Sequence, residues 1–365
     1  MECSIDKQEA KSITLLLTNN CNLSCVYCYE RFKMSRRMSF ETAQKAILEE
    51  FQDNKFKVYN IEFMGGEPLL EFNLIRQISE WLWSQNFEQK YTLFVISNGT
   101  LLTKEMKEWF LSNNQRISIG LSLDGDSDTQ NTNRSNSWHN IDIDFFRSTW
   151  PYEGVKMTIS KQSLSRLAAN VIYFEQLGFK RIQANLAYMD GWDQDDLVIW
   201  NNELASLSDF YVESRSECHC SLLDVKPDCI FVEKAKNKRC GCGHYITCID
   251  TDGRKYPCQM FAPISMNPQT LSKIGNADFD DDSLFFNDKC DRCVLKAACP
   301  ACCGMNLIHK GSLNEIDVFY CKAFMIQYLR NVDYQISMAQ YIENKKERES
   351  LIADLQIMAN SININ

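Results

Sequence analysis

The first 190 residues alternate strand-like and helix-like segments, and this alternation restricts the fold more than any other feature. Six apolar runs rich in β-branched and aromatic residues are candidate strands, at 13–17, 59–64, 91–96, 117–123, 155–159 and 181–186. Helical patterns lie between them, with capping residues at Ser39 and Thr103 and a terminating glycine at Gly178. Such repeats predict a parallel α/β barrel or sheet, in which ligands bind at the carboxyl ends of the strands.

The 17 cysteines are distributed unevenly, with three between residues 21 and 28 and 13 between residues 218 and 321. No apolar run is long enough to span a membrane, and the first twelve residues lack the apolar core of a signal peptide. We therefore expect a cytoplasmic protein, where reduced thiols bind metals or clusters more often than they form disulfides. With only four histidines, a multi-histidine metal site is not expected.

Cys21, Cys25 and Cys28 form a CxxxCxxC motif directly after the first candidate strand. Three thiolates in one loop can hold three irons of a 4Fe–4S cube and leave the fourth iron open for another ligand. The alternative, a structural zinc site, usually needs four protein ligands, and the loop offers three with no histidine nearby. The motif therefore predicts a cluster with one open iron.

This motif after the first strand resembles the radical S-adenosylmethionine (SAM) superfamily, and the resemblance covers residues 1–225. The motif GGEP at 65–68 ends the second candidate strand; in that family it contacts the amino group of the methionine moiety of SAM. In similar enzymes a serine and an arginine bind the ribose and the carboxylate of SAM. The cofactor-binding residues that the resemblance implies are Gly65, Gly66, Glu67, Ser122, Asp124 and Arg134.

The C-terminal cysteines follow a second pattern. Cys242, or alternatively Cys240, precedes Gly253-x4-Cys258, and the stretch TDGRKYPC reads as a hairpin that delivers Cys258. The pattern continues as Cys290-x2-Cys293-x5-Cys299-x3-Cys303 and ends at Cys321. It closely resembles the seven-cysteine SPASM domain, which carries auxiliary 4Fe–4S clusters.

The resemblance implies how the thiols divide between two auxiliary clusters. One cluster uses Cys258, Cys303 and Cys242 or Cys240, and the other uses Cys290, Cys293, Cys299 and Cys321. The spacing leaves open whether Cys240 and Cys242 both bind, and whether Cys302 takes part. Outside the pattern lie Cys218, Cys220, Cys229 and Cys248, for which free thiols are the simpler interpretation. A zinc ribbon is the alternative, although seven or eight thiols in one module do not suit it.

These patterns predict three parts. A partial (β/α)6 TIM-like barrel covers residues 1–225, a cysteine-rich SPASM domain covers 226–330, and a C-terminal helix covers 331–365. The helical pattern itself runs from Ala323 to about Met358. Three 4Fe–4S clusters and SAM are the implied cofactors.

SPASM enzymes mostly act on peptides and proteins. We therefore expect a maturase that cleaves SAM to a 5′-deoxyadenosyl radical, removes hydrogen from a ribosomally synthesised peptide and forms an oxidative crosslink, either a thioether or a C–C or C–O bond. The alternatives are an anaerobic sulfatase-maturing enzyme that forms formylglycine, a peptide epimerase and a non-catalytic electron-transfer protein. The sulfatase-maturing group has an aspartate directly after the hairpin cysteine, whereas this chain has Gln259, which cannot accept a proton at neutral pH. No residue is assigned a catalytic role.

The expected partners are a precursor peptide and a low-potential electron donor such as flavodoxin or ferredoxin. A net charge of −9 and a pI near 5.2 argue against a nucleic-acid partner, and no membrane partner is expected. About twelve residues precede the first strand, so we expect the barrel, the C-terminal helix or a separate protein to bind a leader. We expect the substrate pocket where the strand ends meet the second domain.

Overall fold

The structure is a computed structural model that describes residues 10–52, 55–188, 191–231 and 240–362. The prediction that no signal peptide is present concerns residues 1–12, of which 1–9 lie outside the described residues. Among the helices that are described, none has both the length and the apolar character needed to cross a bilayer.

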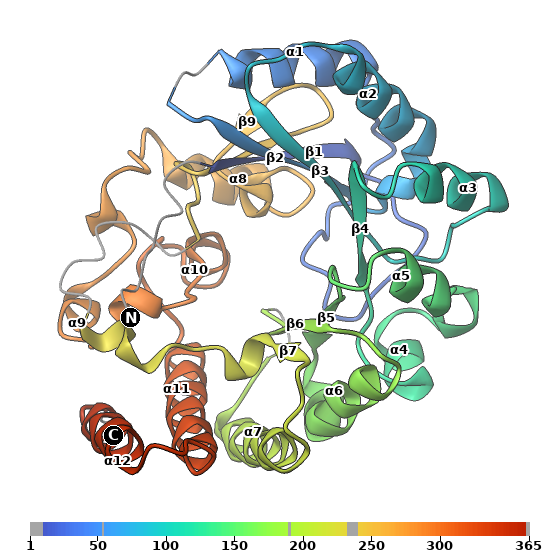
Figure 1. Ribbon diagram of the computed structural model, residues 1–365. Coiled ribbons are helices and arrows are strands. Elements are labelled where there is room, and N and C mark those ends of the chain that lie inside the picture. The colour runs from blue at the N-terminus through green and yellow to red at the C-terminus, as the bar shows by residue number, and fades with distance from the viewer. Residues whose placement is uncertain (1–9, 53–54, 189–190, 232–239, 363–365) are drawn as a thin grey trace.

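Six parallel strands form the curved sheet seen in Figure 1. They are β1 (Ala10–Thr18), β2 (Val58–Gly65), β3 (Lys90–Ser97), β4 (Ile117–Ser122), β5 (Val155–Ile159) and β6 (Arg181–Leu186). Each pairs with the next along the chain, and the short β7 (His219–Cys220) extends the sheet beyond β6. All six candidate strands are present, and the predicted partial α/β barrel is confirmed.

Helices cover the outside of this sheet (Figure 1). They are α1 (Phe40–Phe51), α2 (Phe72–Ser84), α3 (Lys104–Ser112), α4 (Ser127–Asn133), α5 (Ile143–Thr149), α6 (Leu167–Gln176) and α7 (Gln194–Ser214). The predicted caps form, because the hydroxyls of Ser39 and Thr103 accept hydrogen bonds from Thr42 N–H and Met106 N–H. The helix predicted to end before Gly178 is α6, and a 3-10 turn over Lys161–Arg166 precedes it.

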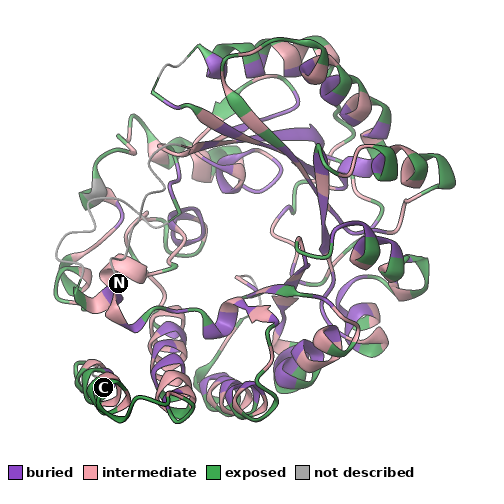
Figure 2. Ribbon diagram, in the orientation of Figure 1, coloured by how far each residue is buried: buried purple, intermediate pink, exposed green. Residues whose placement is uncertain are grey.

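The core lies between the sheet and these helices, and Figure 2 shows buried residues along the strands and on the inward helix faces. In β1 the side chains of Ile13, Leu15 and Leu17 are completely buried. Helix α1 contributes Ala43 and Ile47, one turn apart on its inner face. Full burial of each larger apolar side chain stabilises the fold by roughly 1.5–3 kcal/mol.

The predicted hairpin forms and joins the barrel. Strand β8 (Ile246–Ile249) pairs antiparallel with β9 (Lys255–Tyr256), and β8 also pairs parallel with β1. Ion pairs hold the hairpin in place, because Glu50 on α1 contacts both Lys11 and Lys255 at 2.7 Å. The sheet therefore crosses the domain boundary predicted at residue 226, and the domain limits themselves stay a prediction.

The C-terminal part contains short helices and then two longer ones. The short helices are α8 (Pro268–Leu271), α9 (Asp288–Asp291) and α10 (Cys303–Lys310). The sequence pattern predicted one continuous helix after Cys321, and that continuity is wrong, because the chain forms α11 (Val318–Ala339) and α12 (Lys345–Asn360). Asn344 starts the second helix by accepting hydrogen bonds from two N–H groups of its first turn. The Trp200 indole N–H donates to Ala323 O at 2.9 Å and so joins α11 to α7.

Candidate active site

The three cysteines of the first motif lie together in the loop after β1. All are partly buried, and none forms a disulfide. Within the loop, Cys28 N–H donates to Cys25 O at 3.2 Å, and Leu23 N–H donates to Cys21 Sγ at 3.4 Å. Burial raises the pKa of all three thiols, that of Cys28 to about 11. A bound cationic centre would oppose this effect, because metal ligation requires thiolates.

The ends of neighbouring strands and helices anchor this loop. The Asn22 side chain accepts a hydrogen bond from Asn98 Nδ2 at 2.9 Å and donates one to Thr100 Oγ1 at 2.8 Å, just beyond β3. On its other side, Val26 N–H donates to Asn133 O at the end of α4. The loop that carries the thiols is therefore tied to the segment after β3 on one side and to the end of α4 on the other.

Asp124 organises a buried hydrogen-bond network beside the loop. Its fully buried carboxylate accepts hydrogen bonds from Tyr27 Oη, Arg134 Nη2 (2.9 Å), Asn133 Nδ2 (3.2 Å) and Thr158 N–H (3.0 Å). The Arg134 guanidinium also lies over the Tyr27 ring, 5.4 Å from its centre. Asp124 thus acts here as a positioning residue for Tyr27 and Arg134, while its direct contact with a cofactor stays a prediction.

The two glycines of GGEP allow the end of β2 to touch the cysteine loop. Gly65 has a φ of +121°, a conformation that L side chains rarely adopt. A side chain at Gly66 would clash with the backbone carbonyl of Asn20 and with Cys21. Because neither glycine has a side chain, the two segments come close enough for backbone hydrogen bonds, such as that from Glu67 N–H to Asn20 O at 2.9 Å.

The Glu67 side chain joins the ends of β2 and β3. One carboxylate oxygen accepts hydrogen bonds from Leu69 N–H (3.0 Å) and the Ser97 hydroxyl (2.8 Å), and the other accepts from Asn98 N–H (2.8 Å). Burial raises the pKa of Glu67 to about 7, although these hydrogen bonds oppose the rise. Its predicted contact with the amino group of a cofactor remains untested.

We expect Glu67→Gln to destabilise the protein by about 1–3 kcal/mol, since a buried donor would lose its partner. Whichever way the amide is oriented, its NH2 group faces the N–H of either Leu69 or Asn98. Denaturant unfolding of the wild-type and Glu67→Gln proteins would measure the difference in their free energies of unfolding. Glu105→Gln is the control, because the Glu105 side chain is 73% exposed and should matter little. Equal unfolding midpoints for all three proteins would contradict this role of Glu67.

The buried polar atoms without a hydrogen-bond partner in the part of the chain that the structure describes include Arg134 Nε and Glu30 Oε1, both near the loop. The first is a donor that suits an anionic group, and the second is an acceptor that suits an ammonium group. SAM carries both a carboxylate and an ammonium, so these residues fit it chemically. Ser122 lies partly buried at the end of β4. Sequence reasoning missed Glu30, for which the only signal was its position two residues after Cys28.

Three thiols come together at the first predicted auxiliary site, and two further thiols lie near it. Cys242 shares hydrogen bonds with the thiols of Cys258 and Cys303, which raise the pKa of Cys242. Cys302 lies within electrostatic reach of Cys258, Cys303 and Cys240. A cube binds four protein thiolates at most, so Cys240 and Cys302 are alternative candidates for the fourth ligand.

The four cysteines of the second predicted auxiliary site also come together. Burial raises the pKa of Cys299 to about 12, and the neighbouring Cys321, Cys293 and Cys290 contribute to the rise. In the described residues, no three metal-binding side chains converge on one single-ion position. A cube distributes its thiolates over separate irons, so its ligands stand further apart than those of a single ion.

The cysteines outside both patterns are buried in hydrophobic surroundings. They are Cys218, Cys220, Cys229 and Cys248. Cys248 is completely buried in β8, and burial raises its pKa. Cys248 lies within electrostatic reach of Cys258, and Cys229 belongs to the hydrophobic cluster against which Cys293 packs, whereas Cys218 and Cys220 lie in the core of the barrel.

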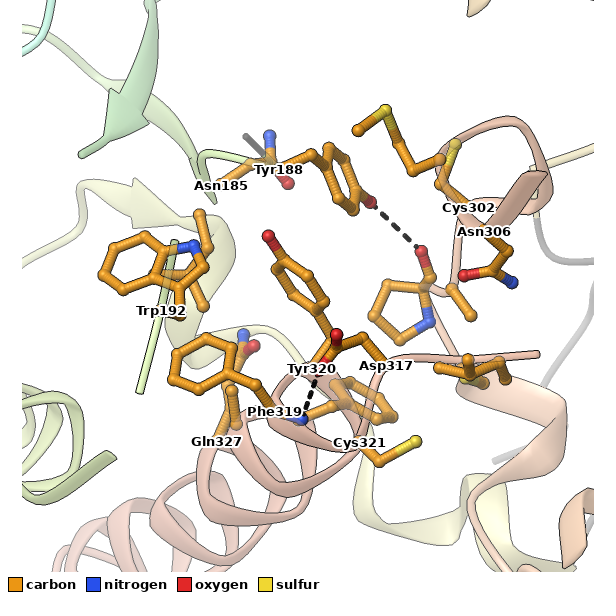
Figure 3. A pocket seen from close by; sticks show the side chains of 18 of the residues that line it. Asn185, Tyr188, Trp192, Cys302, Asn306, Asp317, Phe319, Tyr320, Cys321 and Gln327 are labelled. Atoms are coloured by element: carbon orange, nitrogen blue, oxygen red, sulfur yellow. Dashed lines mark hydrogen bonds between the residues drawn. The ribbon is translucent and has the colours of Figure 1, made fainter. Parts of the chain in front are cut away.

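A cavity of about 260 Å³ lies where the end of β6 meets the cysteine-rich segment and the start of α11 (Figure 3). Its lining includes Cys299, Cys302 and Cys321 together with aromatic side chains from both sides. This is the place at which the sequence predicted a substrate pocket.

The family is decided by a match of residues 15–199, just over half of the chain, to the sequence pattern of the Radical SAM superfamily. The chain belongs to the Radical SAM superfamily. The predicted family is thereby confirmed, and with it SAM and one 4Fe–4S cluster as cofactors of the radical SAM barrel.

Several curated proteins share parts of this radical SAM chain. The antilisterial bacteriocin subtilosin biosynthesis protein AlbA of Bacillus subtilis is 23% identical over 305 residues, which are 79% of this chain and 62% of AlbA. The radical SAM cyclopropyl synthase TigE of Paramaledivibacter caminithermalis is 25% identical over 39% of this chain and 32% of TigE. A serine-type anaerobic sulfatase-maturating enzyme of Bacteroides thetaiotaomicron is 30% identical over 32% of this chain and 30% of that enzyme. The chain thus matches less than two thirds of the length of each of these proteins.

Solved structures show the same fold. The structure described as anSMEcpe with bound AdoMet has a TM-score of 0.71 at 18% identity, and the match covers 94% of this chain and 98% of that one. SuiB of Streptococcus suis bound to precursor peptide SuiA has a TM-score of 0.57 at 18% identity, over 85% of this chain and 75% of SuiB. These likenesses confirm the fold class of a radical SAM barrel followed by a cysteine-rich region.

Proposed function

We propose that this radical SAM enzyme modifies a ribosomally synthesised peptide by forming an oxidative crosslink, either a thioether or a C–C or C–O bond. The observation that carries the proposal is the cavity between the end of β6 and the cysteine-rich segment, with Cys299, Cys302 and Cys321 in its wall. It lies at the carboxyl side of the strands, where barrels of this kind bind their ligands. AlbA is named for subtilosin biosynthesis, and SuiB was solved with its precursor peptide, which supports a peptide as the substrate.

In this proposal the residues of the barrel hold the cofactors. Cys21, Cys25 and Cys28 hold the radical SAM cluster, which together with SAM supplies a radical that removes hydrogen from the substrate. Arg134 and Ser122, with the GGEP segment, bind SAM. Asp124 keeps the Arg134 guanidinium oriented, and the closely packed loop excludes water from it.

The cysteine-rich segment holds two auxiliary 4Fe–4S clusters in this proposal. The first uses Cys242, Cys258 and Cys303, with Cys240 or Cys302 as the further candidates. The second uses Cys290, Cys293, Cys299 and Cys321. Forming a crosslink removes two hydrogens from the peptide: one would pass as an atom to the radical that SAM supplies, and the other would leave as a proton. The one electron left behind would be accepted by a nearby auxiliary cluster.

A second candidate function is the maturation of sulfatases. The match to anSMEcpe over 94% of this chain favours it. Against it stands Gln259, which lies partly buried directly after Cys258, where the sulfatase-maturing group carries a carboxylate. A glutamine cannot act as the base there, so we place this function second.

The decisive experiment is co-expression with a short peptide encoded next to this gene, followed by mass spectrometry. We expect the peptide to lose two hydrogen atoms, and deuterium placed at the reacting carbon to appear in 5′-deoxyadenosine, because a radical this reactive must attack a carbon in direct contact. An unchanged mass with altered stereochemistry would instead indicate an epimerase. A sulfatase-derived peptide serves as the comparison, and an aldehyde detected on it would indicate formylglycine formation and overturn the proposal.

The electron donor, the leader-binding partner and the cellular location of this protein belong to the proposal as predictions. A flavodoxin or ferredoxin as electron donor and a separate leader-binding protein are still predicted partners. The cytoplasmic location is likewise a prediction.

A further inference from the structure

Six aromatic side chains line the cavity, and four of them form two pairs that join separate parts of the chain (Figure 3); the other two are Trp200 and Phe324. Tyr188 and Trp192 follow β6, whereas Phe319 and Tyr320 begin α11. Trp192 stacks on Phe319 with ring centres 5.2 Å apart and planes 4° apart, and Tyr188 packs on Tyr320 at 5.3 Å. The two halves of the cavity wall are therefore held together by ring contacts.

The polar atoms of these rings are bonded to the protein itself. The Tyr320 hydroxyl and the Trp192 indole N–H both donate to Ala187 O, at 2.9 and 2.6 Å. The Tyr188 hydroxyl donates to Pro300 O at 3.4 Å. With their polar atoms turned to the backbone, the rings present carbon and π surface to the cavity.

The size and charge of the cavity restrict what it can hold. Its volume of about 260 Å³, part of which the cluster proposed on Cys299 and Cys321 would fill, is below the roughly 300–1,000 Å³ of pockets for drug-sized ligands, so it suits one side chain at most rather than a folded peptide segment. Lys310 and Asp317 line it as well, but they pair with each other at 3.0 Å. These two opposite charges therefore match each other, and the remaining titratable group in the lining outside the thiols and tyrosines is His309.

We infer that this cavity binds one aromatic side chain of the substrate peptide. The inference rests on the proposed function and narrows its substrate class. An aromatic ring can pack edge-to-face against Tyr188 or Tyr320, which is favourable beyond the burial of its area alone. The ring would then lie beside Cys302 and Cys321, which line the same cavity, so the modified position lies close in sequence to an aromatic residue of the peptide.

The test measures binding of N-acetyl-L-tryptophanamide and N-acetyl-L-lysinamide to the reconstituted full chain by calorimetry or ligand-observed NMR. We expect the tryptophan amide to bind and the lysine amide not to bind. Tyr188→Ala should weaken the tryptophan amide about tenfold, because it removes one ring from the wall. Tyr341→Ala is the matched control: Tyr341 is also partly exposed and also donates one hydrogen bond to a backbone carbonyl, that of Val212, but it lies outside the cavity lining.

Equal binding of both amides, or unchanged binding in Tyr188→Ala, would overturn the inference. A second measurement avoids the need for a variant: photo-crosslinking of wild-type protein with N-acetyl-4-benzoyl-L-phenylalaninamide should label residues of the cavity wall, and labelling confined to other regions would count against it. Neither measurement requires turnover. A chain that modifies a peptide but does not bind the amide therefore refutes only the aromatic site, whereas one that binds the amide but modifies no peptide refutes the proposed function.

Discussion

Replacing Cys21, Cys25 and Cys28 together with alanine should abolish reductive cleavage of SAM by this protein. These three thiols share the loop directly after β1. A cube held by three thiolates keeps one iron open, and SAM binds to that iron. Chromatography would measure 5′-deoxyadenosine, and an iron assay should show a fall from about twelve to about eight iron atoms per chain, because the auxiliary clusters are retained.

The matched control removes two thiols that lie outside both cluster patterns. Cys218 and Cys220 are buried in the core of the barrel and remote in sequence from the radical motif, so their joint replacement with alanine should preserve the iron content and the cleavage of SAM. Formation of 5′-deoxyadenosine by the first variant would refute the assignment. A wild-type protein that saturates near four irons and also binds zinc would instead favour a zinc ribbon in the C-terminal region.

Asp124→Ala should destabilise the protein by about 3–5 kcal/mol, the usual cost of leaving one partner of a buried ion pair without the other. The substitution leaves the guanidinium of Arg134 and the hydroxyl of Tyr27 without their shared acceptor in a site closed to water. Denaturant unfolding of the reconstituted proteins would measure the loss. We also expect weaker SAM binding, because Arg134 would no longer be held in one orientation.

Two comparisons separate this effect from a general loss of packing. Asp144→Ala breaks the exposed pair with Arg147 and should cost at most about 1 kcal/mol. Replacing both members of the buried pair, as Asp124→Leu with Arg134→Met, should recover much of the stability while SAM binding remains lost. If Asp124→Ala unfolds at the same denaturant concentration as Asp144→Ala, the carboxylate does not have the organising role described here.

Local patterns in the sequence determined the barrel and the radical motif. The limits of β5 and β6 agree with the candidate strands at 155–159 and 181–186, because an apolar run followed by a turn is read from neighbouring residues alone. The caps at Ser39 and Thr103 are local for the same reason. The CxxxCxxC spacing likewise places three thiols in one loop without any knowledge of the fold.

Only the tertiary structure decided which distant residues meet. Tyr27 and Asp124 are 97 positions apart in the chain, and no periodicity relates them. Strand β8 adds to β1 across the predicted domain boundary. The aromatic cavity also forms only when α11 packs beside the end of β6. Such contacts depend on the packing of whole elements, which local sequence restricts but does not specify.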